Sequence, residues 1–124
     1  MNWEAKIIRE YEMADCIFCK IGAGTLPAEI VYQNEAVMAF RDLHPKAPVH
    51  VLIIPKKHIT STAELTKDEL PVVAEMMEVA NIVAQKEGTP STYKLVINTG
   101  APAGQVIMHL HMHLLGGKKL SSIV

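Results

Sequence analysis

Apolar and polar residues alternate along residues 109–115, where histidines are separated by leucine and methionine. A period of two is typical of a β-strand with one buried face. We therefore predict a strand with the imidazoles on one face, about 6–7 Å apart from twice the strand rise, and the apolar side chains on the other. A solvated face that happens to be rich in histidine is the alternative to an active-site strand. The histidines are His109, His111 and His113.

Four other segments have the pattern of strands. Residues 48–55 form an almost continuous apolar run rich in β-branched side chains, which indicates a central strand buried on both faces. Residues 29–33 and 36–40 flank a turn and predict a hairpin. Residues 93–98 predict one more strand. The sequence thus predicts five strands.

A single long helix is predicted over residues 66–87, because Thr66 and Glu69 have the spacing of a capping box. The helix carries two adjacent apolar stripes, a wider band than one sheet face requires. We infer that part of this band meets another subunit; a deeply buried helix of a monomer is the alternative. The stripes are Leu70, Val73, Met77, Ala80 and Ala84, and Val72, Met76, Val79 and Val83.

The composition predicts one small domain over residues 15–124, preceded by an N-terminal extension over 1–14. A net charge of −1 gives no basic field for a nucleic-acid backbone. No apolar run approaches the ~18 residues of a membrane span, and acidic residues near the N-terminus argue against a signal peptide. We expect a cytoplasmic protein that binds neither nucleic acid nor membrane.

Cys16 and Cys19 form a Cys-x-x-Cys motif, which is half of a tetrahedral zinc site. A redox pair or two buried cysteines explain the motif as well, although no strand precedes it as in thioredoxin-type pairs. His50 lies in the apolar run and, taken alone, fits a hydrogen-bonded core histidine. Gly100 and Gly104 allow close backbone approach, so free N–H groups of their loop could face an anion.

Five segments together carry a family resemblance: residues 16–21, 39–42, 50–59, 98–100 and 104–113. In order and spacing they resemble the histidine triad family, and within it the Hint branch of purine nucleoside phosphoramidase type, over about residues 15–117. The resemblance implies an α+β fold with a five-stranded antiparallel sheet and one long helix per subunit. It also implies a homodimer that joins the two sheets.

The resemblance further implies hydrolysis of purine nucleoside 5′-phosphoramidates or related AMP conjugates, through a covalent nucleotidyl-histidine. By position, His111 is the nucleophile, and its other ring nitrogen is expected to bond the backbone carbonyl of His109. His113 and His50 are expected to hold the phosphate oxygens and the leaving group. Asp42 would accept from the ribose hydroxyls. The remaining nucleotide-binding residues are Ile17, Phe18, Ile21, Phe40 and Leu43 around the purine, and Asn98, Gly104, Gln105 and Val106 near the phosphate.

Bacterial members that carry metal imply a structural Zn²⁺ on Cys16, Cys19, His58 and His109. No organic cofactor is expected. One departure concerns Val106, which stands where many Hint members have a serine near the leaving-group nitrogen. Two alternatives stay open: a dinucleoside polyphosphate hydrolase of the Fhit type, and a zinc-stabilised nucleotide-binding scaffold with little catalysis.

Overall fold

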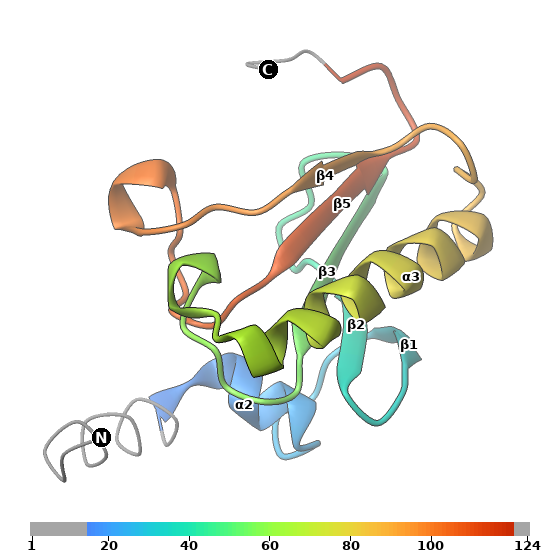
Figure 1. Cartoon of the computed structure of the whole chain (residues 1–124). Coiled ribbons are helices and arrows are strands. Elements are labelled where there is room, and N and C mark those ends of the chain that lie inside the picture. Colours follow the sequence, from blue (N-terminus) through green and yellow to red (C-terminus); the bar gives the residue numbers. More distant parts are fainter. Residues whose placement is uncertain (1–14, 121–124) are drawn as a thin grey trace, which may run out of the picture.

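The computed structural model describes residues 15–120, so the predicted extension over 1–14 lies outside the described residues. Five strands form one sheet in the order β1-β2-β3-β5-β4, and each neighbouring pair is antiparallel (Figure 1). The strands are β1 (Ile30–Gln33), β2 (Val37–Arg41), β3 (Val49–Pro55), β4 (Lys94–Val96) and β5 (Met112–Gly116). The predicted α+β fold with an antiparallel five-stranded sheet is confirmed.

Helices cover the sheet on both sides. The long helix α3 (Leu70–Lys86) lies across one face, and the short helix α2 (Ile17–Gly22) packs on the other (Figure 1). Three 3-10 turns complete the described elements: η1 (Thr62–Glu64), η2 (Lys67–Glu69) and η3 (Ala101–Ala103). The sheet therefore separates two hydrophobic clusters, one under each helix.

Strand β3 shows why two clusters form. Val51 and Ile53 belong to the cluster under α3, whereas Leu52 and Ile54 belong to the cluster under α2. Successive side chains of a strand point to opposite faces, so a strand covered on both sides must be apolar throughout. All seven residues of β3 are buried, as the continuous apolar run predicted.

The predicted helix over 66–87 begins with a tighter turn than expected. The Glu69 N–H donates to the carbonyl of Thr66 at 3.0 Å, an i to i−3 bond that makes η2 a 3-10 turn before α3 begins. The Glu69 carboxylate accepts from the Thr66 N–H at 3.0 Å. This backbone bond, helped by Lys57, lowers the pKa of Glu69. The capping interaction anticipated from the sequence is therefore present.

The strand predicted over 109–115 is shorter than expected, since β5 begins only at Met112. Before it, the Leu110 N–H donates to the carbonyl of Ile59 at 2.6 Å, outside the strand ladder. The two faces nevertheless alternate as predicted, because Leu110, Met112 and Leu114 all enter the cluster under α3. The last predicted strand, 93–98, is also shorter, as β4.

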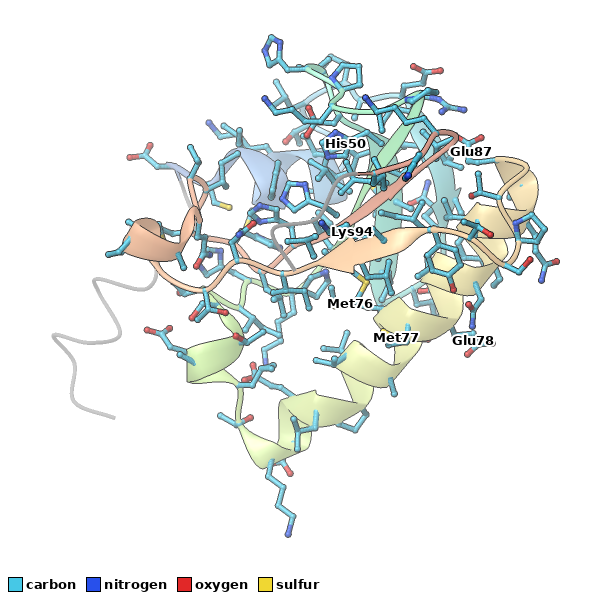
Figure 2. All side chains as sticks on the ribbon, turned by 90° about the horizontal axis from the view of Figure 1, so that it is seen from above. His50, Met76, Met77, Glu78, Glu87 and Lys94 are labelled. Carbon is cyan, nitrogen blue, oxygen red and sulfur yellow. The ribbon has the colours of Figure 1, made fainter. Side chains whose placement is uncertain are left out.

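Helix α3 buries only part of its wide apolar band. Met76 is fully buried against the sheet, whereas Met77, one residue later, is 46% exposed on the outer side with Glu78 (Figure 2). Leu70 is 53% exposed, and Val73 is half-buried. Leu70, Val73 and Met77 thus form an outer apolar stripe that the sheet does not cover. Among residues 15–120, no helix is both long and apolar enough to cross a bilayer.

Candidate functional site

The three histidines of the triad segment and His50 gather on the α2 side of the sheet. His113 lies opposite Leu52 in the β3–β5 register, so His50, two residues earlier on β3, shares its face and lies diagonal to it. The rings of His111 and His113 are 5.1 Å apart between centroids, and those of His50 and His113 are 5.2 Å apart. The sheet thereby brings together residues that are 63 positions apart in the chain.

The ring of His111 has a defined orientation. Its Nδ1 atom lies 2.7 Å from the carbonyl oxygen of His109, so Nδ1 donates to that oxygen. This is the carbonyl partner that was predicted. With its proton on Nδ1, a neutral His111 keeps the lone pair of Nε2 available for a bond to another atom. The Phe18 ring packs edge-on against His111, with centroids 5.2 Å apart, and His111 is 8% exposed.

His50 and His113 form a directed chain of hydrogen bonds. The Lys46 N–H donates to His50 Nδ1 at 3.0 Å, which leaves the proton of a neutral His50 on Nε2. His50 Nε2 lies 3.0 Å from His113 Nδ1, so it donates there. His113 must then carry its own proton on Nε2. His111 and His113 therefore have opposite tautomers: one presents a lone pair and the other a proton.

Burial keeps this chain neutral. Burial lowers the pKa of His113 to about 4, and His111 and His50 act in the same direction. Burial also lowers the pKa of His50, although the Asp42 carboxylate opposes this effect. Asp42 Oδ2 lies 3.6 Å from His50 Nε2, and Asp42 Oδ1 accepts from the His44 N–H at 2.7 Å.

Asp42, His50 and His113 also have the composition of a metal-ligand set. A cation on His50 Nε2 would force the ring proton onto Nδ1, against the Lys46 N–H that donates to that atom. The hydrogen-bonded chain therefore explains this cluster better than metal binding does.

A second cluster contains the four predicted metal ligands. Cys16 Sγ lies 3.2 Å from His109 Nδ1, and Cys19 Sγ lies 3.2 Å from His58 Nδ1 and 3.5 Å from His109 Nδ1. All four ligand atoms are within 4.8 Å of one another. Tetrahedral Zn²⁺ bonds imply a sulfur–nitrogen separation of roughly 3.5 Å, so the four residues fit this ion.

His109 is prepared for such a role by its second ring nitrogen. His109 Nε2 donates to the carbonyl of Pro55 at 2.7 Å, which leaves Nδ1 as the free lone pair facing the sulfurs. Its side chain is fully buried, and burial lowers its pKa to about 4. Burial, together with the neighbouring Cys16, raises the pKa of the Cys19 thiol to about 12. Cys16 also caps α2, since its sulfur accepts from the Cys19 N–H.

An apolar cleft of about 480 Å³ opens beside the histidines. Phe18 and Phe40 meet edge-to-face in its wall, with centroids 5.5 Å apart. The lining includes every residue that was predicted around the purine and the ribose: Ile17, Phe18, Ile21, Phe40, Asp42 and Leu43. It also includes residues that sequence reasoning missed, among them Leu26, Pro27, Leu52 and Ile107. Of these, Leu52 has the same strand parity as His50, a signal that could have identified it.

The comparisons with known proteins agree with this geometry. The family described as "Scavenger mRNA decapping enzyme C-term binding" matches residues 15–123. The chain is 40% identical to the purine nucleoside phosphoramidase of Escherichia coli over 89% of this chain and 93% of that protein. It is 38% identical to the 14 kDa zinc-binding protein of Zea mays, over 92% and 91%. The crystal structure of a HIT family hydrolase from Legionella pneumophila superimposes with a TM-score of 0.84 at 42% identity, covering 86% of this chain and 96% of that one. The chain belongs to the histidine triad (HIT) family.

In this HIT protein, the loop before the triad is closed by its own hydrogen bonds. The N–H groups of Ala103 and Gln105 donate to the carbonyl of Gly100, and the Gly104 N–H donates to that of Ala101. Positive φ angles of 85° at Gly100 and 101° at Gly104 make these tight turns possible. The loop N–H groups that were expected to face an anion, including that of Gln105, are thus already bonded.

The side chains of this loop differ in exposure. Asn98 Nδ2 donates to the carbonyl of Ala103 at 2.9 Å, so Asn98 holds the loop together. Gln105 is 2% exposed, whereas its neighbour Val106 is 87% exposed. Val106 is therefore the only one of the three predicted phosphate-side residues Asn98, Gln105 and Val106 whose side chain extends into solvent.

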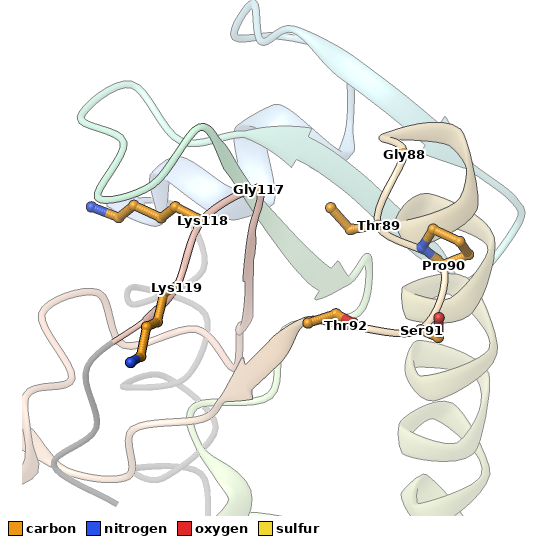
Figure 3. Close-up of a pocket in the computed structure, with 8 residues that line it drawn as sticks. All are labelled: Gly88, Thr89, Pro90, Ser91, Thr92, Gly117, Lys118 and Lys119. Atoms are coloured by element: carbon orange, nitrogen blue, oxygen red, sulfur yellow. The ribbon is translucent and has the colours of Figure 1, made fainter.

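A second cleft, of about 500 Å³, lies between residues 88–92 and 117–119 (Figure 3). Its lining contains hydroxyl side chains and Lys118 and Lys119, and Figure 3 shows the two segments facing each other beside the end of α3. None of its lining residues belongs to the triad, to the Cys/His cluster or to the apolar cleft. The HIT site is therefore confined to the α2 side of the sheet.

Proposed function

We propose that the protein is a nucleotide-binding hydrolase of the Hint branch that cleaves purine nucleoside 5′-phosphoramidates or related AMP conjugates. The observation that carries this proposal is the pair of opposite tautomers at His111 and His113, with ring centroids 5.1 Å apart. A nucleophile and a proton donor side by side are what displacement of an amine from phosphorus requires. The printed names of the E. coli phosphoramidase and the Legionella hydrolase support the same reaction class.

In the first step, the lone pair of His111 Nε2 forms a bond to the α-phosphorus, and the phosphorus–nitrogen bond to the amine breaks. The Nε2 proton of His113 passes to the departing amine. The bond from His111 Nδ1 to the His109 carbonyl stabilises the positive charge that develops on the His111 ring. In the second step, water attacks phosphorus, the bond to His111 breaks, and the water proton returns to His113. AMP and the free amine are the products.

The apolar cleft is proposed to hold the purine between Phe18, Phe40 and Ile21, with Leu43 at its exposed edge. Asp42 would accept from the ribose hydroxyls. Its Oδ1 already accepts from the His44 N–H, and each carboxylate oxygen accepts more than one bond, so capacity for the ribose remains.

We also propose that Cys16, Cys19, His58 and His109 hold a structural Zn²⁺. The two-sulfur, two-nitrogen donor set and its spacing support this ion. When bound, zinc supplies a rigid link between α2 and the triad segment. The zinc-binding relative from maize is consistent with this proposal.

The outer stripe of α3, Leu70, Val73 and Met77, supports a homodimer, since three apolar side chains in one row lie outside the sheet contact. Burial of such a row against a second copy is favourable by the hydrophobic effect.

The test is AMP release from adenosine 5′-phosphoramidate by the wild type and by His111→Ala, with AMP affinity measured in both. We expect release that disappears in the variant while AMP binding is largely kept. Diadenosine polyphosphates in parallel distinguish the Fhit-type activity. A folded wild type that binds AMP but releases none from either substrate would instead support a binding protein with little catalysis.

A further inference from the structure

Gln105 directs both ends of its side-chain amide into the protein. Its Oε1 accepts from the Gly100 N–H at 2.8 Å, and its Nε2 donates to the carbonyls of Thr60 at 2.7 Å and Ile107 at 3.1 Å. The side chain is 2% exposed. An amide with one acceptor and two donors filled in this way has little capacity left for a substrate.

These bonds join two separate parts of the site. Gly100 and Ile107 are close to the two ends of the loop before the triad, and Ile107 lines the apolar cleft. Thr60 follows the segment that carries His58, one of the cluster ligands. The Leu110 N–H bond to the Ile59 carbonyl and the contact between the Thr62 and Thr99 hydroxyls connect the same two segments.

We propose that Gln105 is a positioning residue for the reaction: its buried amide fixes the backbone from Gly100 to Ile107 against Thr60 and so sets where Val106, Ile107 and the triad segment lie relative to the phosphate. The proposal rests on the proposed function for its effect on rate. The geometric part, that the amide holds the loop, stands on the hydrogen bonds alone. Misplacement of groups around a reacting centre by about 1 Å costs about 100-fold in rate, so a loosened loop reduces kcat.

Gln105→Glu tests this role because it changes one donor group into an acceptor at nearly constant volume. The carboxylate still accepts from the Gly100 N–H but faces the carbonyls of Thr60 and Ile107 with negative charge. We expect kcat to fall about 100-fold at neutral pH. KM should change little, because the purine and ribose contacts lie elsewhere in the cleft.

Protonation provides a signature that a merely structural role does not give. The groups facing this amide are all backbone groups, so the introduced carboxyl is the one titratable group at that point. Desolvation and the two carbonyls raise its pKa, and once protonated it donates a hydrogen bond again. The ratio of variant to wild-type kcat should therefore recover as the pH is lowered. Gln85→Glu, on the exposed side of α3, is the matched control and should keep a constant ratio.

Gln105→Met, which has similar length but no hydrogen bonds, and amide hydrogen exchange on all variants complete the experiment. We expect faster exchange over residues 99–107 in both Gln105 variants. Unchanged kcat in folded variants, a rise in KM alone, a kcat ratio that does not vary with pH, or failure of both variants to fold would each overturn the positioning role. An inactive wild type would refute the proposed function instead, and exchange over 99–107 would then decide whether Gln105 holds the loop.

Discussion

His109 contacts His111 through its backbone and the Cys/His cluster through its ring. The carbonyl oxygen of His109 lies 2.7 Å from His111 Nδ1, while its Nδ1 lies 3.2 Å from Cys16 Sγ. One residue thus connects the proposed metal site to the proposed nucleophile. Because both contacts are buried, a displacement of the His109 ring also changes the orientation of His111.

We predict that Cys16→Ser removes bound zinc and lowers the free energy of unfolding by about 2 kcal/mol or more, because α2 loses its link to the triad segment. Metal content by native mass spectrometry and thermal unfolding measure both effects. His44→Asn, at an exposed position, serves as the control. A wild type that takes up no zinc when refolded with the ion would contradict the prediction.

We predict that His50→Phe lowers kcat about 100-fold, because His113 Nδ1 loses its donor and the ring no longer favours the tautomer with a proton on Nε2. His50→Gln, whose amide can donate to His113, should recover part of the rate. Steady-state release of AMP measures both variants. Equal activity of the two variants would refute the tautomer argument.

Leu43→Ala and Phe40→Ala should separate ligand binding from stability. Leu43 is 88% exposed, so its truncation should weaken AMP binding with little change in unfolding free energy. Phe40 is 4% exposed and packs on Phe18, so its truncation should cost about 3–5 kcal/mol of stability as well. Calorimetric titration with AMP and denaturant unfolding measure the two quantities. Unchanged AMP affinity in Leu43→Ala would remove Leu43 from the site.

Acid should destabilise the protein through His113. Its pKa is lowered from 6.5 to about 4 in the folded chain, so between these values the unfolded chain binds more protons and stability falls as the pH decreases. We expect the melting temperature to drop between about pH 7 and about pH 4, and His113→Asn to reduce that drop. The exposed His44→Asn should behave as the wild type. A steeper drop in His113→Asn would contradict this account.

Met77→Lys should prevent dimer formation, because it places a charge in the outer apolar stripe of α3 (Figure 2). Glu78→Lys, also exposed, is a demanding control because it changes the charge by two instead of one. Analytical ultracentrifugation measures the molecular mass of each. A wild type that sediments as a monomer at high concentration would refute the homodimer.

The sequence determined which side chains face the same way. Alternation over 109–115 and the apolar run of 48–55 each reflect a local property, the two-residue period of extended backbone, and this holds even at residues 109–111, which precede β5. The capping box before α3 is similarly local. The motif resemblance added the four cluster residues and the cleft residues, all of which the structure brings together as expected.

Only the tertiary structure decided how hydrogen bonds are shared between distant segments. The sequence suggested that the Gly100–Gly104 loop offers free N–H groups, yet those of Gly100, Ala103, Gly104 and Gln105 are bonded, and the amide of Gln105 reaches across to Thr60. Likewise, the tautomer of His113 depends on Lys46, through His50. A donor's partner is set by where the fold places acceptors, and residue spacing along the chain does not contain that information.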